Sequence, residues 1–251
     1  QLAPGGGVTA LARDDAAAFE PIVSAFSAHV VSGAVRLRSR TTAGAIYGRD
    51  LLVAGEDGVE VVEARAIVLA CGAHDGALAF EGNDLPGVMS ARAAGWLLNG
   101  GVLVGERVAV VVPAGGGPFG ESFARAAREI ATVEVIYGEP VAVRGTGGAK
   151  GIRVRPYPAS GEKTREVSIE ADAVLVDAPR SPAYELAQQA GATLVHDPAR
   201  GFFVRTDRGW VAGDPATSGV WAVGEVSALP LDAAAIAANA QLVAARIVAG
   251  A

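Results

Sequence analysis

The segment GERVAVVVPAGGGPFGESFARAAREIATVEVIYGEP, which runs from Gly105 to Pro140, decides the fold predicted for this chain. It opens with a β-branched run over Arg107–Val112 that is typical of a buried strand. Apolar residues then recur at helical spacing over Phe119–Ile130, and Val133–Tyr137 has the composition of a second strand. We therefore predict a strand, a glycine turn, a helix and a second strand, as in a parallel α/β sheet.

Three glycines stand between the first strand and the helix, and Gly115, Gly117 and Gly120 have the spacing G-x-G-x-x-G. In a dinucleotide-binding turn these glycines permit a tight bend, a close approach to pyrophosphate and close packing of helix on strand. The N–H groups at the start of the helix then attract phosphate. An acidic residue about twenty positions later holds a ribose hydroxyl, and Glu139 lies near that place.

A second interpretation of the same turn stays open. Pro113 and Pro118 stiffen it, and Gly115–Gly117 is an uninterrupted run of glycine. Glycine-rich turns between a strand and a helix also occur in α/β folds that bind nothing there. The dinucleotide interpretation requires that the backbone amides of this turn are not already bonded within the chain.

Length and composition narrow the class of protein. A chain of 251 residues suits one large domain or two smaller ones and needs no disulfide to stabilise its core. The formal net charge of −6 argues against a nucleic-acid partner. Cys71 is the only cysteine, which excludes an internal disulfide and a multi-cysteine metal site. We expect no metal, no membrane span and, because no signal peptide is visible, a cytoplasmic location.

Two further stretches have strands that end in small residues. Ala66–Leu69 is an apolar strand followed by Ala70–Ala73, and Gly219–Val223 is followed by Gly224 and Glu225. Small residues at the carboxyl edge of a parallel sheet let a flat or phosphate-bearing group come close. A carboxylate at that edge accepts hydrogen bonds from the hydroxyls of a cofactor sugar or ribityl chain.

The remaining segments predict a mixture of helices and short strands. Gly55–Gly58 (GEDG) is a hairpin signal, and Ser90 is a predicted N-cap. Helices are expected around Ala16–Ala28, Ser90–Leu98, Ser181–Gly191 and Ala233–Ala249, and strands over Ala34–Arg40, Ala43–Tyr47, Asp50–Ala54, Val59–Ala64, Val141–Val143, Gly151–Pro156, Val167–Ile169, Ala173–Val176 and Phe202–Val204.

Several single residues have an ordinary structural interpretation. We expect Cys71 to be a small packed residue rather than a reactive thiol, and His74 to face solvent in a loop. Asp172 and Asp177 flank a strand and are expected to be solvated. Trp96, Trp210 and Trp221 are expected in the core or at an interface.

Three stretches together carry a resemblance: AIVLACGAHDGALAFEGNDLPGVMSARAA (Ala66–Ala94), RSPAYELAQQAGATLVHDPARGFFV (Arg180–Val204) and GVWAVGEVSA (Gly219–Ala228). The chain resembles two-dinucleotide-domain flavoproteins of the pyridine nucleotide-disulfide oxidoreductase type. Within them it looks most like the α subunit of heterotetrameric sarcosine oxidase and its relatives, which are hydrogen cyanide synthase, opine oxidase and dye-linked proline or hydroxyproline dehydrogenase. The likeness extends over nearly the whole chain from about Val35.

The resemblance implies an α/β fold with two Rossmann-like dinucleotide-binding domains, in three layers, with parallel sheets and antiparallel meanders. Residues 1–100 and 207–251 would form an FAD-type domain, and residues 101–206 an inserted NAD-type domain. The family opens with its own strand and G-x-G-x-x-G for the FAD pyrophosphate. This chain is expected to start after that unit, which leaves the FAD-type domain incomplete at its N-terminus.

The resemblance also implies cofactor-binding residues. Gly115, Gly117 and Gly120, with Glu139, would hold NAD or another adenine nucleotide. Cys71, Gly72 and Ala73 would match the family's Ala-Thr-Gly segment near FAD, with Cys71 in place of threonine. Gly224 and Glu225 would match the Gly-Asp that touches the ribityl chain, with the carboxylate one methylene further out.

The implied function is a nucleotide-binding subunit of a multi-subunit FAD-dependent oxidoreductase that acts on the CH–NH group of an amine or imino acid. Its partner would be an amine-oxidase-like β subunit or other subunits of a hetero-oligomer. Because substrate oxidation would occur on the partner, no catalytic residue is assigned here. A non-catalytic assembly subunit that keeps the fold and binds no flavin stays open as an alternative, and a free-standing NAD(P)H reductase would need an intact FAD site.

Overall fold

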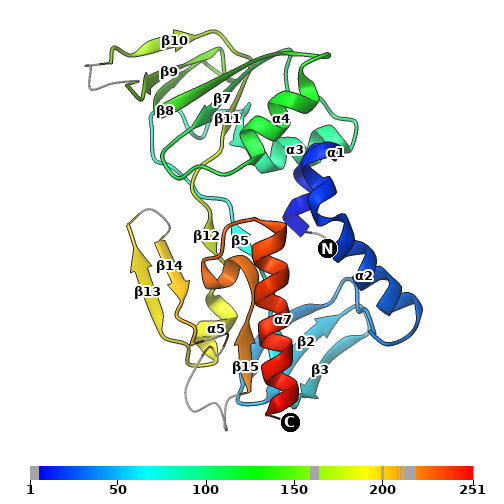
Figure 1. Ribbon diagram of the computed structural model, residues 1–251. Helices are drawn as coiled ribbons and strands as arrows, with labels where there is room; N and C mark the ends of the chain where they lie inside the picture. Colours follow the sequence, from blue (N-terminus) through cyan, green and yellow to red (C-terminus); the bar gives the residue numbers. More distant parts are fainter. Residues whose placement is uncertain are drawn as a thin grey trace. The chain divides into compact units, whose positions relative to one another are not determined.

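A computed structural model describes residues 6–158, 164–198, 201–207, 209, 211 and 219–250. The chain divides into two compact units, and Figure 1 labels most of their helices and strands. Unit 1 comprises Gln1–Gly6, Phe19–His74 and Ser181–Ala251, and unit 2 comprises Gly7–Ala18 and Asp75–Arg180. The chain therefore changes unit at residues 6/7, 18/19, 74/75 and 180/181.

Unit 2 contains a six-stranded mixed sheet in the order β10-β9-β8-β7-β11-β6. Its centre is parallel, since β7 pairs with β8 and β11, and β11 pairs with β6. The β8–β9–β10 side is antiparallel. The strands are β6 (Val88–Ser90), β7 (Arg107–Val112), β8 (Thr132–Arg144), β9 (Gly151–Pro156), β10 (Val167–Ile169) and β11 (Ala173–Val176). Residues 75–100, which include β6, belong to unit 2.

The apolar runs of the sequence form the core of this sheet. All four residues of β11 and the last five of β7 are buried, as expected for parallel strands that are covered on both faces. Helix α4 (Phe119–Ala127) packs on β7 and β8 through Phe119 and Phe123, both 1% exposed. Ile130, which the helical spacing included, lies beyond the end of α4 and is 58% exposed.

Helix α3 (Ala91–Asn99) begins where the sequence predicts it. The Ser90 hydroxyl accepts a hydrogen bond from the Ala93 N–H at 3.1 Å, which confirms Ser90 as the N-cap. The arm formed by η1 (Gly6–Ala10) and α1 (Arg13–Ala16) joins unit 2 through Asp15. Its carboxylate accepts hydrogen bonds from Ser122 at 2.6 Å and from Arg125 at 2.7 Å.

Unit 1 combines an antiparallel three-stranded sheet, β1-β2-β3, with a parallel pair, β4–β15. The predicted hairpin at Gly55–Gly58 is confirmed. The strands are β1 (Thr42–Tyr47), β2 (Asp50–Gly55), β3 (Gly58–Glu63), β4 (Ile67–Leu69), β5 (Ala73–His74), β12 (Ser181–Pro182), β13 (Leu194–Asp197), β14 (Gly201–Val204) and β15 (Val220–Ala222). The helices are α2 (Glu20–Val31), α5 (Glu185–Gln189), η3 (Gly224–Ser227) and α7 (Ala233–Ala249), while the short helix η2 (Ala17–Phe19) spans the change from unit 2 to unit 1.

Two local predictions in unit 1 are wrong. Ala34–Arg40 forms no strand, and two of its three arginines instead make ion pairs from a loop, Arg38 with Glu60 and Arg40 with Glu56. Ser181–Pro182 does not begin a helix, because these two residues form strand β12, which pairs with β5, and α5 starts only at Glu185. Within the described ranges, none of the helices has both the length and the apolar character needed to cross a bilayer.

Candidate functional site

The glycine corner of unit 2, residues Ala114–Gly120, connects β7 to α4. Gly115 has φ +73°, a backbone conformation that favours glycine, so it makes the predicted tight turn. A Cβ on Gly120 would lie 2.7 Å from Val110 Cγ1, so this glycine allows the predicted close packing of helix on strand. A Cβ on Gly116 would lie 2.6 Å from the Asp177 carbonyl oxygen. The corner is therefore tightly packed against the end of β11.

Most of the amides that a phosphate would need are bonded within unit 2. The Gly120 N–H donates to Asp177 Oδ2 at 2.7 Å, and the Phe119 N–H also donates to this carboxylate. The Ala114 N–H donates to the Tyr157 hydroxyl at 2.6 Å, and the Gly116 N–H donates to the Pro113 carbonyl at 2.9 Å. The structure thus brings the predicted glycines together, but most backbone N–H groups of their corner already donate hydrogen bonds to other groups of the protein.

Asp177 is the residue that the sequence interpretation missed. It was expected to be solvated, but it is only 4% exposed, and its own N–H donates to Val111 O at 2.9 Å. Burial raises the pKa of its carboxyl to about 6, against the opposing effect of the two backbone donors. Asp75 raises this pKa further and Arg180 lowers it. The sequence signal that could have identified Asp177 is an aspartate directly after a fully apolar strand. Neighbouring parallel strands end at the same edge of a sheet, so such a residue comes close to the turns that follow them.

Glu139, the predicted ribose-binding acid, is also bonded within unit 2. The Tyr157 hydroxyl donates to its carboxylate while accepting from Ala114. Burial, and then this carboxylate, raise the pKa of Tyr157 above its ordinary value. A cavity of about 390 Å³ remains beside the corner, lined by Val112, Pro113, Ala114, Gly115, Gly116, Tyr137 and Tyr157.

The second candidate region is the β4–β15 edge of unit 1, formed by Gly72, Gly224 and Glu225. Strands β4 and β15 are parallel neighbours, so their carboxyl ends lie together. Gly72 has φ +72° and Gly224 has φ +75°. A Cβ on Gly72 would lie 3.6 Å from Glu225 Oε2, and a Cβ on Gly224 would meet nothing within 4 Å. The structure brings these three predicted residues together and leaves space above Gly224.

The neighbours of this edge fix its backbone. The Gly224 N–H donates to Asn239 Oδ1 of α7 at 3.0 Å, and the Gly72 carbonyl accepts from the Ala183 N–H at 3.0 Å. Ala73, also predicted at the cofactor, is buried in the short β5–β12 pairing.

Cys71 and His74 have no catalytic geometry. Cys71 is exposed, but desolvation by surrounding atoms, and then the charge of Glu185, raise the pKa of its thiol. A thiol with a raised pKa stays protonated at neutral pH and is a poor nucleophile. His74 is exposed and its Nε2 lies 3.2 Å from Glu185 Oε1. Among the residues that the structure describes, no three or more His, Cys, Asp or Glu side chains form a group suited to a metal ion.

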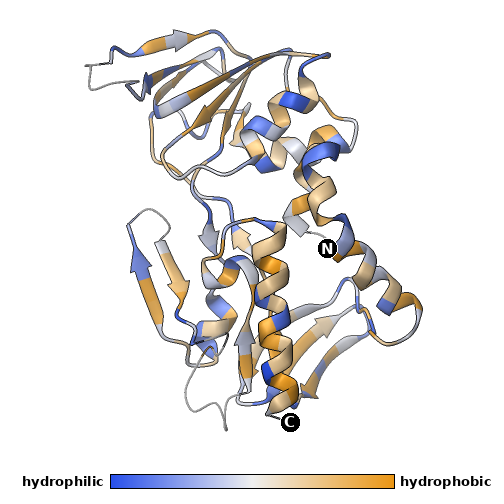
Figure 2. Ribbon diagram, viewed as in Figure 1, coloured by the Kyte–Doolittle hydropathy of each residue, from blue (hydrophilic) through white to orange (hydrophobic). Residues whose placement is uncertain are grey.

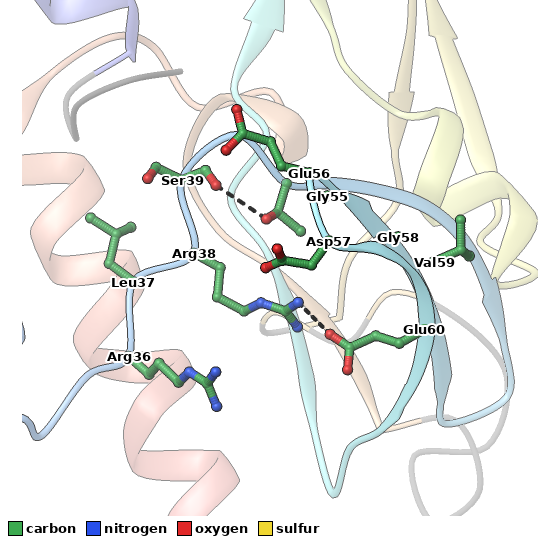
Figure 3. Close-up of a pocket in the computed structure, with 11 residues that line it drawn as sticks. Arg36, Leu37, Arg38, Ser39, Gly55, Glu56, Asp57, Gly58, Val59 and Glu60 are labelled. Atoms are coloured by element: carbon green, nitrogen blue, oxygen red, sulfur yellow. Dashed lines mark hydrogen bonds and ion pairs between the residues drawn. The ribbon is translucent and has the colours of Figure 1, made fainter.

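A separate cavity of about 500 Å³ lies in unit 1 between the loop 36–39 and the β2–β3 turn (Figure 3). Its side chains carry charges of both signs, and the ion pair between Arg38 and Glu60 crosses it. It has none of the predicted cofactor residues in its lining. We therefore place the candidate site at the β4–β15 edge and not in this cavity.

Comparison with solved structures shows which fold this chain has. An L-proline dehydrogenase from P. horikoshii matches with a TM-score of 0.65 and 21% identity, over 90% of this chain and 44% of that one. A thioredoxin reductase from Lactococcus lactis matches with a TM-score of 0.65 and 16% identity, over 98% and 88%. An FAD-dependent pyridine nucleotide-disulphide oxidoreductase from Desulfovibrio vulgaris matches with a TM-score of 0.56 and 17% identity, over 84% and 62%.

The fold is that of the FAD- and NAD(P)-binding oxidoreductases. The predicted α/β, Rossmann-like fold class is thereby confirmed. This chain spans less than two thirds of the length of the proline dehydrogenase and of the Desulfovibrio protein. No protein-family model and no curated protein matches the sequence.

Proposed function

We propose that this chain is the nucleotide-binding subunit of a multi-subunit, FAD-dependent oxidoreductase that acts on an amine or imino acid. The observation that carries the proposal is the β4–β15 edge, where Gly72 and Gly224 both have positive φ beside the Glu225 carboxylate. Ligands of α/β sheets bind at the carboxyl ends of parallel strands, where small residues permit a close approach. The residues at this edge fit the hydroxyl-bearing chain of a flavin.

Each residue of the edge would have a distinct part in holding FAD. The backbone of Gly224 leaves room for the ribityl chain, and the carboxylate of Glu225 would accept hydrogen bonds from its hydroxyls. Gly72, at φ +72°, would let the facing backbone turn beside that carboxylate. The flavin, when bound, would supply the two-electron redox chemistry, while the protein orients it and shapes its surroundings.

The substrate class rests on similarity. The sequence resembles the α subunits of sarcosine oxidase and its relatives, and one structural neighbour is a dehydrogenase of proline, an imino acid. In those α subunits the substrate is oxidised on a partner. We assign no general base in this chain, since the pKa of the Cys71 thiol is raised and His74 is exposed, with its Nε2 3.2 Å from Glu185 Oε1.

A partner subunit is supported by the surface of α7. This helix has the sequence AAAIAANAQLVAARIVA and only one charged residue, Arg246. Figure 2 shows it as apolar along most of its length. Only Val243 is buried, whereas Leu242 is 45% exposed and Val248 is 77% exposed. Apolar surface of this kind is typical of a protein interface.

The test is to purify the protein alone and together with the products of neighbouring genes, and to record flavin absorbance and thermal stability with added FAD. We expect bound flavin or a rise in melting temperature with FAD, because a ligand that binds only the folded state stabilises it. If both preparations lacked flavin absorbance and also showed no melting shift with FAD, the proposal would be contradicted.

A second candidate function is a non-catalytic assembly subunit that keeps the fold and binds no flavin. The observation that favours it is the pairing of the glycine corner with Asp177 and Tyr157, which shows that one nucleotide-type turn of this chain is bonded within the protein. The absence of flavin from a stable, native hetero-oligomer would support this second function.

A further inference from the structure

The strongest unassigned feature lies in unit 2, where a charged side chain is buried at the start of a helix. Asp177 and Ser122 are the only polar side chains buried to this degree among the described residues. The Asp177 carboxylate accepts the N–H groups of Phe119 and Gly120, the first two residues of α4. These are the donors that a helix start offers to an anion.

This arrangement explains why three positions of the corner, Gly116, Gly117 and Gly120, are glycine. A Cβ on Gly117 would lie 3.1 Å from Asp177 Oδ1, and a Cβ on Gly120 would lie 3.3 Å from Asp177 Oδ2. A Cβ on Gly116 would lie 2.6 Å from the Asp177 carbonyl oxygen. The small residues that make room for pyrophosphate in a dinucleotide site here make room for an aspartate of the same chain.

We propose that Asp177 is an internal anion that takes the position of a ligand phosphate, so that the glycine corner excludes dinucleotide pyrophosphate. This inference concerns unit 2 alone and does not depend on flavin binding in unit 1. A pyrophosphate at this position would bring further negative charge against a buried carboxylate and would have to compete for the same N–H donors.

The charged groups around Asp177 do not make the corner favourable for pyrophosphate. Asp75 acts on Asp177 as a like charge, and Arg180 as an opposite one. The Arg180 guanidinium lies over the Phe119 ring, 5.1 Å from its centroid, and has interactions of its own. Beside the corner, Tyr157 and Tyr137 donate to the carboxylates of Glu139 and Glu121. The cavity there is therefore flanked by acidic groups, which disfavours phosphate.

Removal of the carboxylate should convert the corner into an anion site. In an Asp177→Ala variant the N–H groups of Phe119 and Gly120 lose their acceptor, and the space of the carboxylate opens beside Gly117. Charge-assisted hydrogen bonds to a phosphate would replace those to the aspartate, which corresponds to a gain in affinity of about tenfold or more.

The experiment is an amide NMR titration of the full chain with inorganic pyrophosphate and with NAD, read at the Phe119 and Gly120 amides. We expect no saturable shift in the wild type and saturable shifts in Asp177→Ala. Asp172→Ala is the matched control, because Asp172 precedes the same strand and is exposed. It should behave like the wild type.

Asp177→Asn, which keeps the shape and removes the charge, serves if the alanine variant does not fold. It should bind pyrophosphate more tightly than the wild type and less tightly than alanine, since its oxygen still accepts one N–H. Saturable binding of NAD at these amides in the wild type would overturn the proposal. So would folded Asp177 variants that bind pyrophosphate no better than the wild type.

Discussion

Both units place glycine and a carboxylate at the carboxyl end of a parallel strand, yet the two regions differ in where the carboxylate goes. In unit 1, Glu225 follows Gly224 after β15 and is half-buried, while Gly224 is buried but leaves space for an added Cβ. In unit 2, Asp177 follows β11 directly and turns inward to the start of α4. The same residue types therefore produce an open edge in one unit and a closed corner in the other.

The difference teaches that a glycine spacing does not define a nucleotide site by itself. Whether a phosphate can bind depends on which acceptor is already hydrogen-bonded to the N–H donors at the start of the helix. In unit 2 that group is covalently part of the chain, so it has a high effective concentration. In unit 1 the glycines of the edge have few close neighbours, since a Cβ on Gly224 would meet no atom within 4 Å and a Cβ on Gly72 would meet Glu225 Oε2 at 3.6 Å.

The largest expected effect concerns the pH dependence of stability. The folded pKa of Asp177 is raised to about 6 from an ordinary 3.8, so between these values the folded chain holds a proton that the unfolded chain has lost. Stability should therefore fall as pH rises from about 4 to 6, by about 3 kcal/mol in total, and stay level above. The unfolding free energy of Asp177→Asn, measured with denaturant, should lack this fall between about pH 4 and 6. Identical pH profiles would show that Asp177 is not a buried carboxylate.

The next effect concerns packing at the glycine corner, compared with a loosely packed glycine of the same unit. Gly116→Ala places a Cβ 2.6 Å from the Asp177 carbonyl and 2.8 Å from Val112 Cγ1. We expect a loss of about 2–3 kcal/mol in unfolding free energy by chemical denaturation. Gly148→Ala, whose Cβ would lie 3.6 Å from its nearest neighbour, is the control and should cost much less. Equal costs would mean that the corner is looser than described.

A smaller effect on stability, with a larger one on binding, is expected at the open edge. Gly224→Ala meets no atom within 4 Å but must keep φ near +75°, so it should cost about 1 kcal/mol. It should also weaken FAD binding, because its methyl group enters the space assigned to the ribityl chain. Gly48→Ala, at φ +64° with nothing within 4 Å, should show the same stability cost in thermal unfolding and unchanged FAD affinity.

The smallest effect concerns the charge at this edge. Glu225→Gln keeps the shape of the side chain and removes its charge, so FAD affinity should fall about fivefold as a charge-assisted hydrogen bond becomes a neutral one. Calorimetric titration would measure this fall, with Glu63→Gln on exposed strand β3 as the control. An affinity unchanged by Glu225→Gln but lowered by Glu63→Gln would place the flavin elsewhere.

Much of the fold was predictable because its signals are local. The apolar run before Gly115, the GEDG turn and the Ser90 cap each determine their own segment, and the structure confirms all three. Ala34–Arg40 misled the prediction because alternation of apolar residues and arginine is also compatible with a loop held by ion pairs. Ser181–Pro182 misled it because pairing with β5 overrides a capping signal.

The closure of the corner was not predictable from the glycines alone. Asp177 lies 57 residues from Gly120 in sequence, and only the parallel pairing of β11 with β7 brings it to the helix start. The arm at Gly7–Ala18 was missed for a similar reason, since its contact through Asp15 depends on residues in α4. Long-range register decides both features.

The most direct test of the contrast between the two regions is an amide NMR titration of the wild-type chain with FAD. The account predicts saturable shifts at the amides of Gly72 and Gly224 and none across Gly115–Gly120. Saturable shifts across Gly115–Gly120, with Gly72 and Gly224 unchanged, would contradict it.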